Sequence, residues 1–293
     1  LAKPARPDPE SAPLDELDLF LPDLFHDDYH VKVFGRLRAE DPVFHQEVEE
    51  LGSTWNVTRY EDIMAVDTDH ETFSSDGSIV ATDQDEDFAL PMFIAMDPPR
   101  HDQQRREVNG VVAPRNLAVM EETIRGRVQT ILAGLPIGET FNWVDEVSIE
   151  LTTQMLATLF DFPFEDRHKL TRWSDVATAD DQSGIIESEE QRREELIECL
   201  MYFTELWNQR VNQPPAMDLV SMLAHGESTK NMDPMEYLGN LVLLIVGGND
   251  TTRNSITGGV RFLNQFPDEY RKLTDNPGLI PNMVPEIIRF QTP

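Results

Sequence analysis

Hydrophobic residues recur with a helical period through most of the chain after residue 101, and this pattern predicts a mainly α protein. Asp233 followed by Pro234 is typical of a helix start, and the periodic pattern continues from there beyond Arg261. The predicted helices are 148–160, 166–178, 188–211, one from Pro234 and one that begins between Pro281 and Pro285. The chain shows no internal repeat and no alternation of strands with helices, which excludes a parallel-sheet fold.

The first hundred residues have a weaker periodic pattern of hydrophobic residues. A brief alternation around 55–60 predicts a short strand, followed by a helix from Tyr60. Residues 74–95 mix glycine, aspartate and isolated hydrophobic residues without a period, so we expect a long loop, and loops of this length are usually either functional or disordered. Residues 1–13 contain four prolines and many charges and are expected to form a mobile arm, with 14–293 as a single domain.

Charge and composition exclude several classes of function. The formal net charge is -30, from 54 acidic and 24 basic residues, and such a chain repels nucleic acid. The longest apolar run, Leu241 to Val246, is too short to span a bilayer, and the start of the chain lacks a signal sequence. We therefore expect a cytoplasmic protein whose first residues are missing or trimmed. Its one cysteine, Cys199, excludes internal disulfides, and its helical, apolar surroundings predict a core position.

The segment from Leu241 to Thr252 combines an apolar helix half, two adjacent glycines, and an acid beside two threonines. A glycine inside a helix costs about 0.8–1 kcal/mol relative to alanine, so Gly247 and Gly248 need an explanation. Close packing between helices is one explanation. The acid favours another, because a buried carboxyl next to a hydroxyl can relay protons, and the glycines would leave room for a flat cofactor. Asp250 is thus a candidate proton carrier.

Two pairs of residues have the spacing of neighbours on a helix face. Glu286 and Arg289 stand at i, i+3, which by itself is typical of a solvated ion pair. His101 and Arg105 stand at i, i+4 after two prolines, and two adjacent donors suit an anionic group. An ordinary helix start with a surface histidine has the same pattern.

Other candidate sites have weaker support in the sequence. The run from His26 to His30 contains metal-ligand residue types but lacks a second group of ligands. The sequence contains no H-E-x-x-H motif, no P-loop and no nucleophile elbow. We therefore expect neither a metalloprotease, nor a nucleotide hydrolase, nor a serine hydrolase.

Three of these segments resemble motifs of the cytochromes P450. Gly247 to Thr252 is similar to the family's oxygen-activation motif, and Glu286 to Arg289 to its E-x-x-R motif. Asp97 to Arg105 is similar to its D-P-P-x-H-x-x-x-R segment. The resemblance extends from about residue 14 to the end of the chain. It implies the P450 fold, which is helical with a small β-sheet region, and haem b as cofactor.

The resemblance also implies roles for single residues. It implies that Asp250 and Thr251 manage water and protons during oxygen activation, and that Glu286 and Arg289 form a buried structural pair. The residues implied in binding haem are His101, Arg105, Gly247 and Gly248. The helix that carries His101 lies in the family on the face where the electron donor docks. Arg100, Arg105, Arg106 and Arg115 make a basic island there, which suits an acidic ferredoxin.

Longer stretches resemble one branch of the family, the soluble bacterial alkane and fatty-acid terminal hydroxylases. The stretches are 148–164, 169–176, 247–259 and 284–293. They imply a monooxygenase of the alkane 1-monooxygenase type, which inserts one oxygen atom of O2 into the terminal C–H bond of a medium-chain alkane or fatty acid. Electrons would come from NADH through ferredoxin reductase and an iron–sulfur ferredoxin. We expect Leu243, Val246 and the 74–95 loop to line a narrow apolar channel.

Two alternatives stay open at this point. One is a hydroxylase of terpenoids or other bulky lipids. The other is a helical lipid-binding protein that uses the same apolar groove without redox chemistry.

The resemblance further implies that the iron ligand is a cysteine in an F-x-x-G-x-x-x-C-x-G loop well after the E-x-x-R motif. The sequence ends at Pro293, four residues after Arg289. Cys199 lies before the oxygen-activation motif and in no such loop. We therefore expect the P450 fold to be incomplete at the C-terminus, with the metal ligand beyond Pro293 and no metal ligand in this fragment, which by itself would be inactive.

Overall fold

The structure, a computed structural model, describes residues 6–21, 23–48, 52–77, 79, 86–179 and 183–292. It divides into two compact units, Leu1–Glu86 with Ala95–Asp97, and Asp87–Ile94 with Pro98–Pro293. The main elements are α1 (Tyr29–Glu40), β1 (Val43–Val48), β2 (Gly52–Val57), α2 (Tyr60–Asp67), α3 (Arg100–Val108), α4 (Pro114–Gly134), α5 (Glu150–Phe160), α6 (His168–Thr178), α7 (Glu189–Arg210), α8 (Leu219–His225), α9 (Pro234–Gln265), α10 (Pro267–Asp275) and α11 (Ile280–Gln291). The prediction of a mainly α protein is confirmed.

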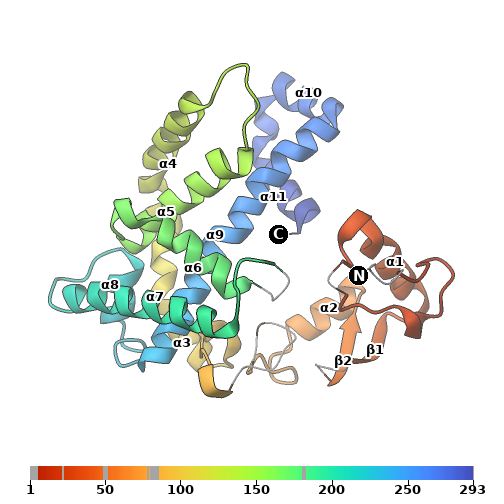
Figure 1. The fold of residues 1–293 in the computed structure, drawn as a ribbon, viewed down its shortest axis with the longest axis horizontal. Helices are drawn as coiled ribbons and strands as arrows, with labels where there is room; N and C mark the ends of the chain where they lie inside the picture. The colour runs from red at the N-terminus through yellow and green to blue at the C-terminus, as the bar shows by residue number, and fades with distance from the viewer. Residues whose placement is uncertain are drawn as a thin grey trace. The chain divides into compact units, whose positions relative to one another are not determined.

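The smaller unit holds α1, α2 and a two-stranded antiparallel sheet (Figure 1). The strands pair with His45 opposite Trp55, and the two rings lie 4.7 Å apart. The strand predicted at 55–60 is only partly correct, because β2 begins at Gly52 and ends at Val57. Its partner β1 was not predicted. Short strands gain most of their stability from cross-strand pairing, so their hydrophobic pattern alone is a weak signal.

The start of the chain contacts this unit. Residues 1–5 of the expected N-terminal arm lie outside the described residues. In the described part, Arg6 donates hydrogen bonds to the carbonyl oxygens of Asp23 (3.1 Å) and His26 (2.9 Å). The Tyr29 hydroxyl donates to the carbonyl oxygen of Pro7 (2.8 Å). The mobility of the arm stays a prediction.

The larger unit is built around α9, which contacts α5, α6, α7, α10 and α11 (Figure 1). Asp233 caps this helix as predicted, since its carboxylate accepts hydrogen bonds from the backbone N–H groups of Met235 (2.9 Å) and Glu236 (3.0 Å). An aromatic cluster fills the core beside it, and its fully buried members are Phe160, Trp173 and Phe203. Apolar burial of this size supplies the main driving force for folding.

The predicted helices of this unit agree with the observed ones to within about two residues, with one exception. The chain enters α5 through a π-helical segment, Val144–Ile149, so the helix predicted from Ser148 begins earlier. By contrast, α9 is α-helical from Pro234 to Gln265, with no π or 3-10 turn at Gly247 and Gly248. Single π turns occur mostly at functional sites. Here the irregular turn lies in the helix that packs against α9.

The 74–95 loop is described only in part, since residues 78 and 80–85 lie outside the described residues. Its described residues include two short 3-10 turns, Glu86–Phe88 and Phe93–Ala95, and no longer element. Its predicted contact with substrate stays a prediction.

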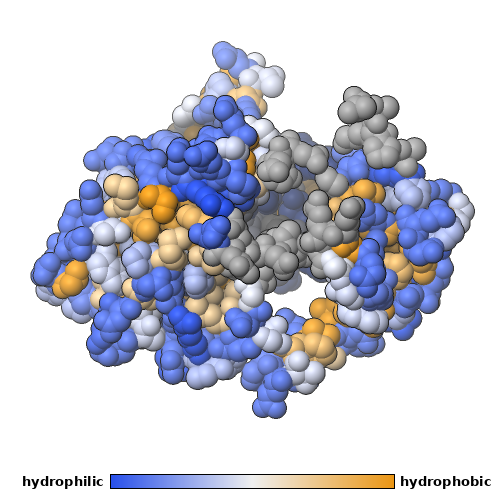
Figure 2. Space-filling view, turned by 60° about the horizontal axis from the view of Figure 1, so that its bottom comes forward, coloured by the Kyte–Doolittle hydropathy of each residue, from blue (hydrophilic) through white to orange (hydrophobic). Residues whose placement is uncertain are grey.

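The surface is mainly hydrophilic, in keeping with the net charge of -30. Figure 2 shows hydrophobic residues on one face as separate patches among hydrophilic ones. Among the helices of the described residues, none has both the length and the hydropathy that crossing a membrane requires.

Candidate active site

One face of α9 changes from apolar to polar along its length. Leu243, Gly247 and Thr251 follow each other at intervals of four residues and therefore share this face. Leu243 and the neighbouring Val246 are half-buried, whereas Gly247 and Thr251 are exposed. A Cβ atom added to Gly247 would meet no atom within 4 Å. The helix backbone is thus open at Gly247, between an apolar stretch and a hydroxyl group.

Gly248 lies on a different face of α9, against α5. A Cβ atom added there would lie 2.7 Å from Leu156 Cδ2 of α5, closer than real Cβ contacts. The glycine allows α5 and α9 to approach each other, as small residues do between packed helices. For Gly248 this placement favours the helix-packing explanation over contact with a cofactor.

Asp250 belongs to a charged cluster. Its carboxylate pairs with Arg253 one turn later, and Arg253 also pairs with Asp175 of α6 at 3.2 Å. Burial raises the pKa of Asp250 above its ordinary value, the Arg253 guanidinium opposes this shift, and Asp175 adds to it. A carboxyl group with a raised pKa holds its proton closer to neutral pH, as a general acid requires.

Thr251 lies beside an apolar groove. Its hydroxyl donates a hydrogen bond to the carbonyl oxygen of Gly247 (3.2 Å), and the side chain is exposed. The groove, of about 460 Å³, runs between α9 and α11. Its lining residues are Thr251, Thr252, Ser255, Ile256, Gly259, Val260, Leu263, Met283, Val284, Ile287 and Ile288. The Asp250 cluster and the Thr251 hydroxyl therefore lie next to each other on a helix that borders an apolar space.

The second predicted pair lies on α3. His101 is half-buried, and its Nδ1 lies 2.9 Å from the carboxylate of Asp102. Arg105 is exposed, and within the described residues it has no ion pair. One turn after His101, Gln104 is buried and donates to the carboxylate of Glu236 at 2.6 Å. Residues at i, i+3 are neighbours on a helix surface, so His101 lies next to the side of α3 on which Gln104 contacts α9.

A polar network attaches α3 to the first turns of α9. Glu236 is buried and also accepts a hydrogen bond from Arg100 at 2.6 Å. Asn240 is fully buried, donates to Gln104 Oε1 (3.2 Å) and accepts the backbone N–H of Phe93 (2.9 Å). A rise of 1.5 Å per residue places Gly247 roughly 10 Å beyond Asn240 along the helix axis.

Two features fit the haem group that the family resemblance implies. The open backbone at Gly247 suits the flat face of a cofactor. The guanidinium of Arg105, unpaired within the described part of the chain, suits a propionate carboxylate. His101 could add a second donor from the same helix face once it turns from Asp102.

The Glu286–Arg289 pair forms, but the expectation that it is buried is wrong. Arg289 donates two hydrogen bonds of 2.8 Å to the Glu286 carboxylate. The Glu286 side chain is 61% exposed and the Arg289 side chain is 66% exposed. Within the described residues, no segment covers this face of α11, so the pair lies in water.

Cys199 is fully buried in α7, as predicted. Burial raises the pKa of its thiol far above the ordinary value, so the side chain stays protonated. It therefore cannot serve as a thiolate ligand in this position. The described residues contain no group of three or more His, Cys, Asp or Glu side chains arranged to hold a metal ion.

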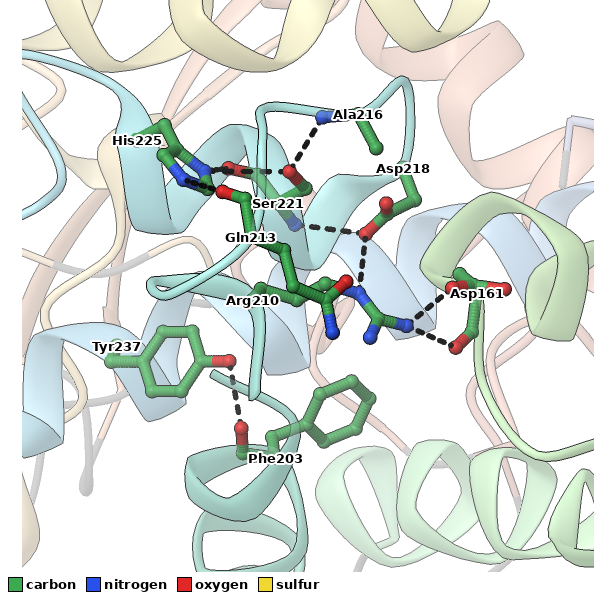
Figure 3. Close-up of polar contacts among 9 residues, drawn as sticks. All are labelled: Asp161, Phe203, Arg210, Gln213, Ala216, Asp218, Ser221, His225 and Tyr237. Carbon is green, nitrogen blue, oxygen red and sulfur yellow. Dashed lines mark hydrogen bonds and ion pairs between the residues drawn. The ribbon is translucent and has the colours of Figure 1, made fainter. Parts of the chain in front are cut away.

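A second polar cluster contains an Asp, a Ser and a His, and Figure 3 shows that they do not form a catalytic triad. The Asp218 carboxylate accepts the backbone N–H of Ser221 (2.8 Å), which makes it the N-cap of α8. The two ring nitrogens of His225 face the carbonyl oxygens of Ser221 (2.8 Å) and Gln213 (3.1 Å). Since Asp218 does not orient the imidazole, the cluster holds the loop before α8 in place.

Sequence reasoning missed two members of the charged cluster. Arg253 stands at i+3 from Asp250, so its spacing contained a usable signal. Asp175 lies 78 residues before Arg253 and comes from another helix, so only the packing of α6 on α9 reveals it.

The chain is similar to known proteins over most of its length. No model of a protein family matches the chain. The linalool 8-monooxygenase of Pseudomonas putida is 30% identical over 290 residues, which cover 94% of this chain and 71% of that protein. The methyl-branched lipid omega-hydroxylase of Mycobacterium bovis is 28% identical over 302 residues, which cover 97% of this chain and 70% of that protein.

A solved structure is also similar. CYP153D17 from Sphingomonas sp. PAMC 26605 is 45% identical and superimposes with a TM-score of 0.83. The match covers 92% of this chain and 68% of that one. The similarity therefore extends over nearly the whole chain.

Proposed function

The chain belongs to the cytochrome P450 family of monooxygenases, and from this premise we propose that it hydroxylates the terminal C–H bond of medium-chain alkanes or fatty acids. The observation that carries the proposal is the face of α9 on which apolar side chains lead to the open backbone at Gly247 and then to Thr251. Leu243 and Val246 would line the narrow end of the substrate channel. A relative named as a lipid omega-hydroxylase supports terminal attack.

Each candidate site residue would have its own role in the reaction. When bound, haem supplies the oxidising power that inserts the oxygen atom into the C–H bond. His101 and Arg105 would hold its propionates, and the open backbone at Gly247 would accept its flat face. The hydroxyl of Thr251 would hold a water molecule in place by a hydrogen bond. Asp250 would take up protons from solvent and pass them to that water, which its raised pKa favours.

Substitutions of Thr251 and Asp250 test the roles proposed for these two residues. Thr251→Ala in the intact enzyme should keep haem and substrate binding, yet NADH should be consumed with hydrogen peroxide replacing the alcohol. Asp250→Asn should slow the whole cycle because the amide cannot carry a proton. Thr252→Ala is the matched control, since this exposed threonine borders the same groove. Wild-type rate and coupling in both Thr251→Ala and Asp250→Asn would refute the assignment.

The substrate is tested by product analysis. An internal methylene is easier to oxidise than a terminal methyl group, so terminal attack requires a channel that lets only the chain end reach the reacting centre. We expect medium-chain alkanes or fatty acids to perturb the haem spectrum and to yield primary alcohols. A terpenoid hydroxylase is the second candidate, supported by the relative named as linalool 8-monooxygenase. A preference for terpenoids, or mainly sub-terminal products, would favour that candidate.

Electrons would arrive from NADH through ferredoxin reductase and an iron–sulfur ferredoxin. Arg105, Arg106 and Arg115 are exposed and form the basic island on α3 and the start of α4. A basic patch on an otherwise acidic protein suits an acidic ferredoxin. The rate of electron transfer should then fall as salt concentration rises, because salt screens exposed charges. A rate independent of salt would contradict docking at this patch.

A further inference from the structure

Asn249, between Gly248 and Asp250, is fully buried at the contact between α9 and α5. Its Oδ1 accepts a hydrogen bond from the Thr152 hydroxyl at 2.9 Å. Its Nδ2 is buried and has no hydrogen-bond partner among the described residues. A buried amide costs free energy unless its hydrogen bonds are made, and the Nδ2 donor of Asn249 is unmet within the described residues. The polar side chain therefore calls for a purpose other than packing.

Thr152 connects Asn249 to the irregular turn before α5. Its hydroxyl lies within hydrogen-bond distance of the carbonyl oxygens of Ser148 (3.0 Å) and Ile149 (3.1 Å). Both carbonyls belong to the π-helical segment Val144–Ile149. A π turn disturbs the regular pairing of backbone groups. The single hydroxyl proton of Thr152 is shared among these two carbonyls and Asn249 Oδ1, so this side chain contacts both the π turn and α9.

A second contact repeats the arrangement further along α9. The hydroxyl groups of Ser148 and Thr257 lie 2.9 Å apart, and Ser148 is fully buried. Asn249 and Thr257 are eight residues apart, or roughly 12 Å along the helix axis. We call Ser148, Thr152, Asn249 and Thr257 the polar clamp. Two separated contacts with one partner fix both the rotation of a helix about its axis and its position along that axis.

The segment held in this way contains Asp250 and Thr251. They differ by about 100° in direction around the helix, so one faces the Arg253–Asp175 cluster and the other the apolar groove. A rotation of α9 would misdirect both side chains together. Misplacement of a reacting group by about 1 Å can cost 100-fold in rate.

We propose that Asn249 is a positioning residue, and that the polar clamp fixes the rotation of α9 at which Asp250 and Thr251 act together. The inference rests on the proposed function of these two residues. It assigns to Asn249 and Thr152 an effect on coupling, although neither touches the substrate space.

The test compares two adjacent threonines of α5. Thr152 bonds to Asn249 of α9, whereas Thr153, equally buried, bonds to Thr171 of α6 at 2.6 Å. Each is replaced by valine, which keeps the shape and removes the hydroxyl, and Thr152→Ser serves as the conservative variant. Amide hydrogen exchange of residues 249–257, measured in the protein without cofactor, reports directly on the anchoring of α9.

We expect Thr152→Val to speed exchange in 249–257 at least about tenfold, a loss of about 1.4 kcal/mol in local opening free energy. Asn249→Leu should do the same. Thr153→Val should leave exchange in this segment unchanged, and Thr152→Ser should restore it. In the intact enzyme, Thr152→Val should lower the yield of alcohol per NADH several-fold while haem content stays at the wild-type level.

Two outcomes would overturn the inference. One is unchanged exchange in Thr152→Val, which would mean that the polar clamp does not hold α9. The other is faster exchange with unchanged coupling, in an enzyme whose Thr251→Ala variant is uncoupled. If Thr251→Ala and Asp250→Asn themselves keep wild-type rate and coupling, the proposed function fails instead, and the exchange experiment tells the two failures apart.

Discussion

Two glycines of α9 make a sharp test of its packing, because alanine should act in opposite directions at the two positions. At Gly239, an added Cβ atom would lie 2.1 Å from the carbonyl oxygen of Pro91 and 2.8 Å from its carbonyl carbon. These are backbone atoms, so a side-chain rotation cannot relieve the clash. At Gly247 the same atom would meet nothing within 4 Å.

The magnitudes follow from the contacts. In a helix interior alanine is more stable than glycine by about 0.8–1 kcal/mol, which is the whole expected effect of Gly247→Ala. At Gly239 the same gain is opposed by overpacking, which costs about 1–3 kcal/mol. A shift of the 90–93 segment would also break the bond from the Phe93 N–H to Asn240, and a buried donor left unpaired costs about 1–3 kcal/mol. The net loss is about 3 kcal/mol.

Urea denaturation followed by far-ultraviolet circular dichroism measures both effects on the same protein. We expect Gly239→Ala to lower the unfolding free energy by about 3 kcal/mol and Gly247→Ala to raise it by about 1 kcal/mol. The midpoint of thermal unfolding of Gly239→Ala should fall by roughly 10 °C. If Gly239→Ala were as stable as the wild type, α9 would not pass against Pro91 as described, and the position of the 90–93 segment would be wrong.

Three further predictions concern charges and the cysteine. Arg105→Gln should weaken haem binding in the intact enzyme, measured by haem content and hemin titration, whereas Arg106→Gln on the same helix should not; equal losses would contradict the assignment. Arg172 lowers the pKa of Glu195 below its ordinary value of 4.5, so their pair adds stability above pH 4.5 that is lost as the pH falls through the lowered pKa. Glu195→Gln should therefore cost up to about 1 kcal/mol at pH 7 and progressively less as the pH falls through the lowered pKa, and a loss that is independent of pH would contradict this. Cys199 should resist labelling by maleimide until the protein unfolds. This chain with hemin should also give no thiolate-type Soret band when it is reduced in the presence of carbon monoxide. Labelling of the native protein, or such a band, would show that the thiol is accessible.

The sequence alone could predict features that depend on neighbours along the chain. The start of α9 is one, because the cap of Asp233 and the fixed backbone angle of Pro234 act within a single turn. The helical period predicted α6, α7 and α11 for the same reason. The juxtaposition of Gly247, Asp250 and Thr251 is also local, so a candidate site could be named before its surroundings were known.

Only the tertiary structure decided the rest. Gly247 and Gly248 are equivalent in the sequence, yet one faces open space and the other faces Leu156, because packing against α5 sets the rotation of α9. The partner of Arg253 on α6, the strand β1 and the exposure of Glu286 likewise depend on which segments meet. Such contacts join residues far apart in the chain, and their free energies depend on desolvation and approach in three dimensions. A local pattern of residue types contains no information about them.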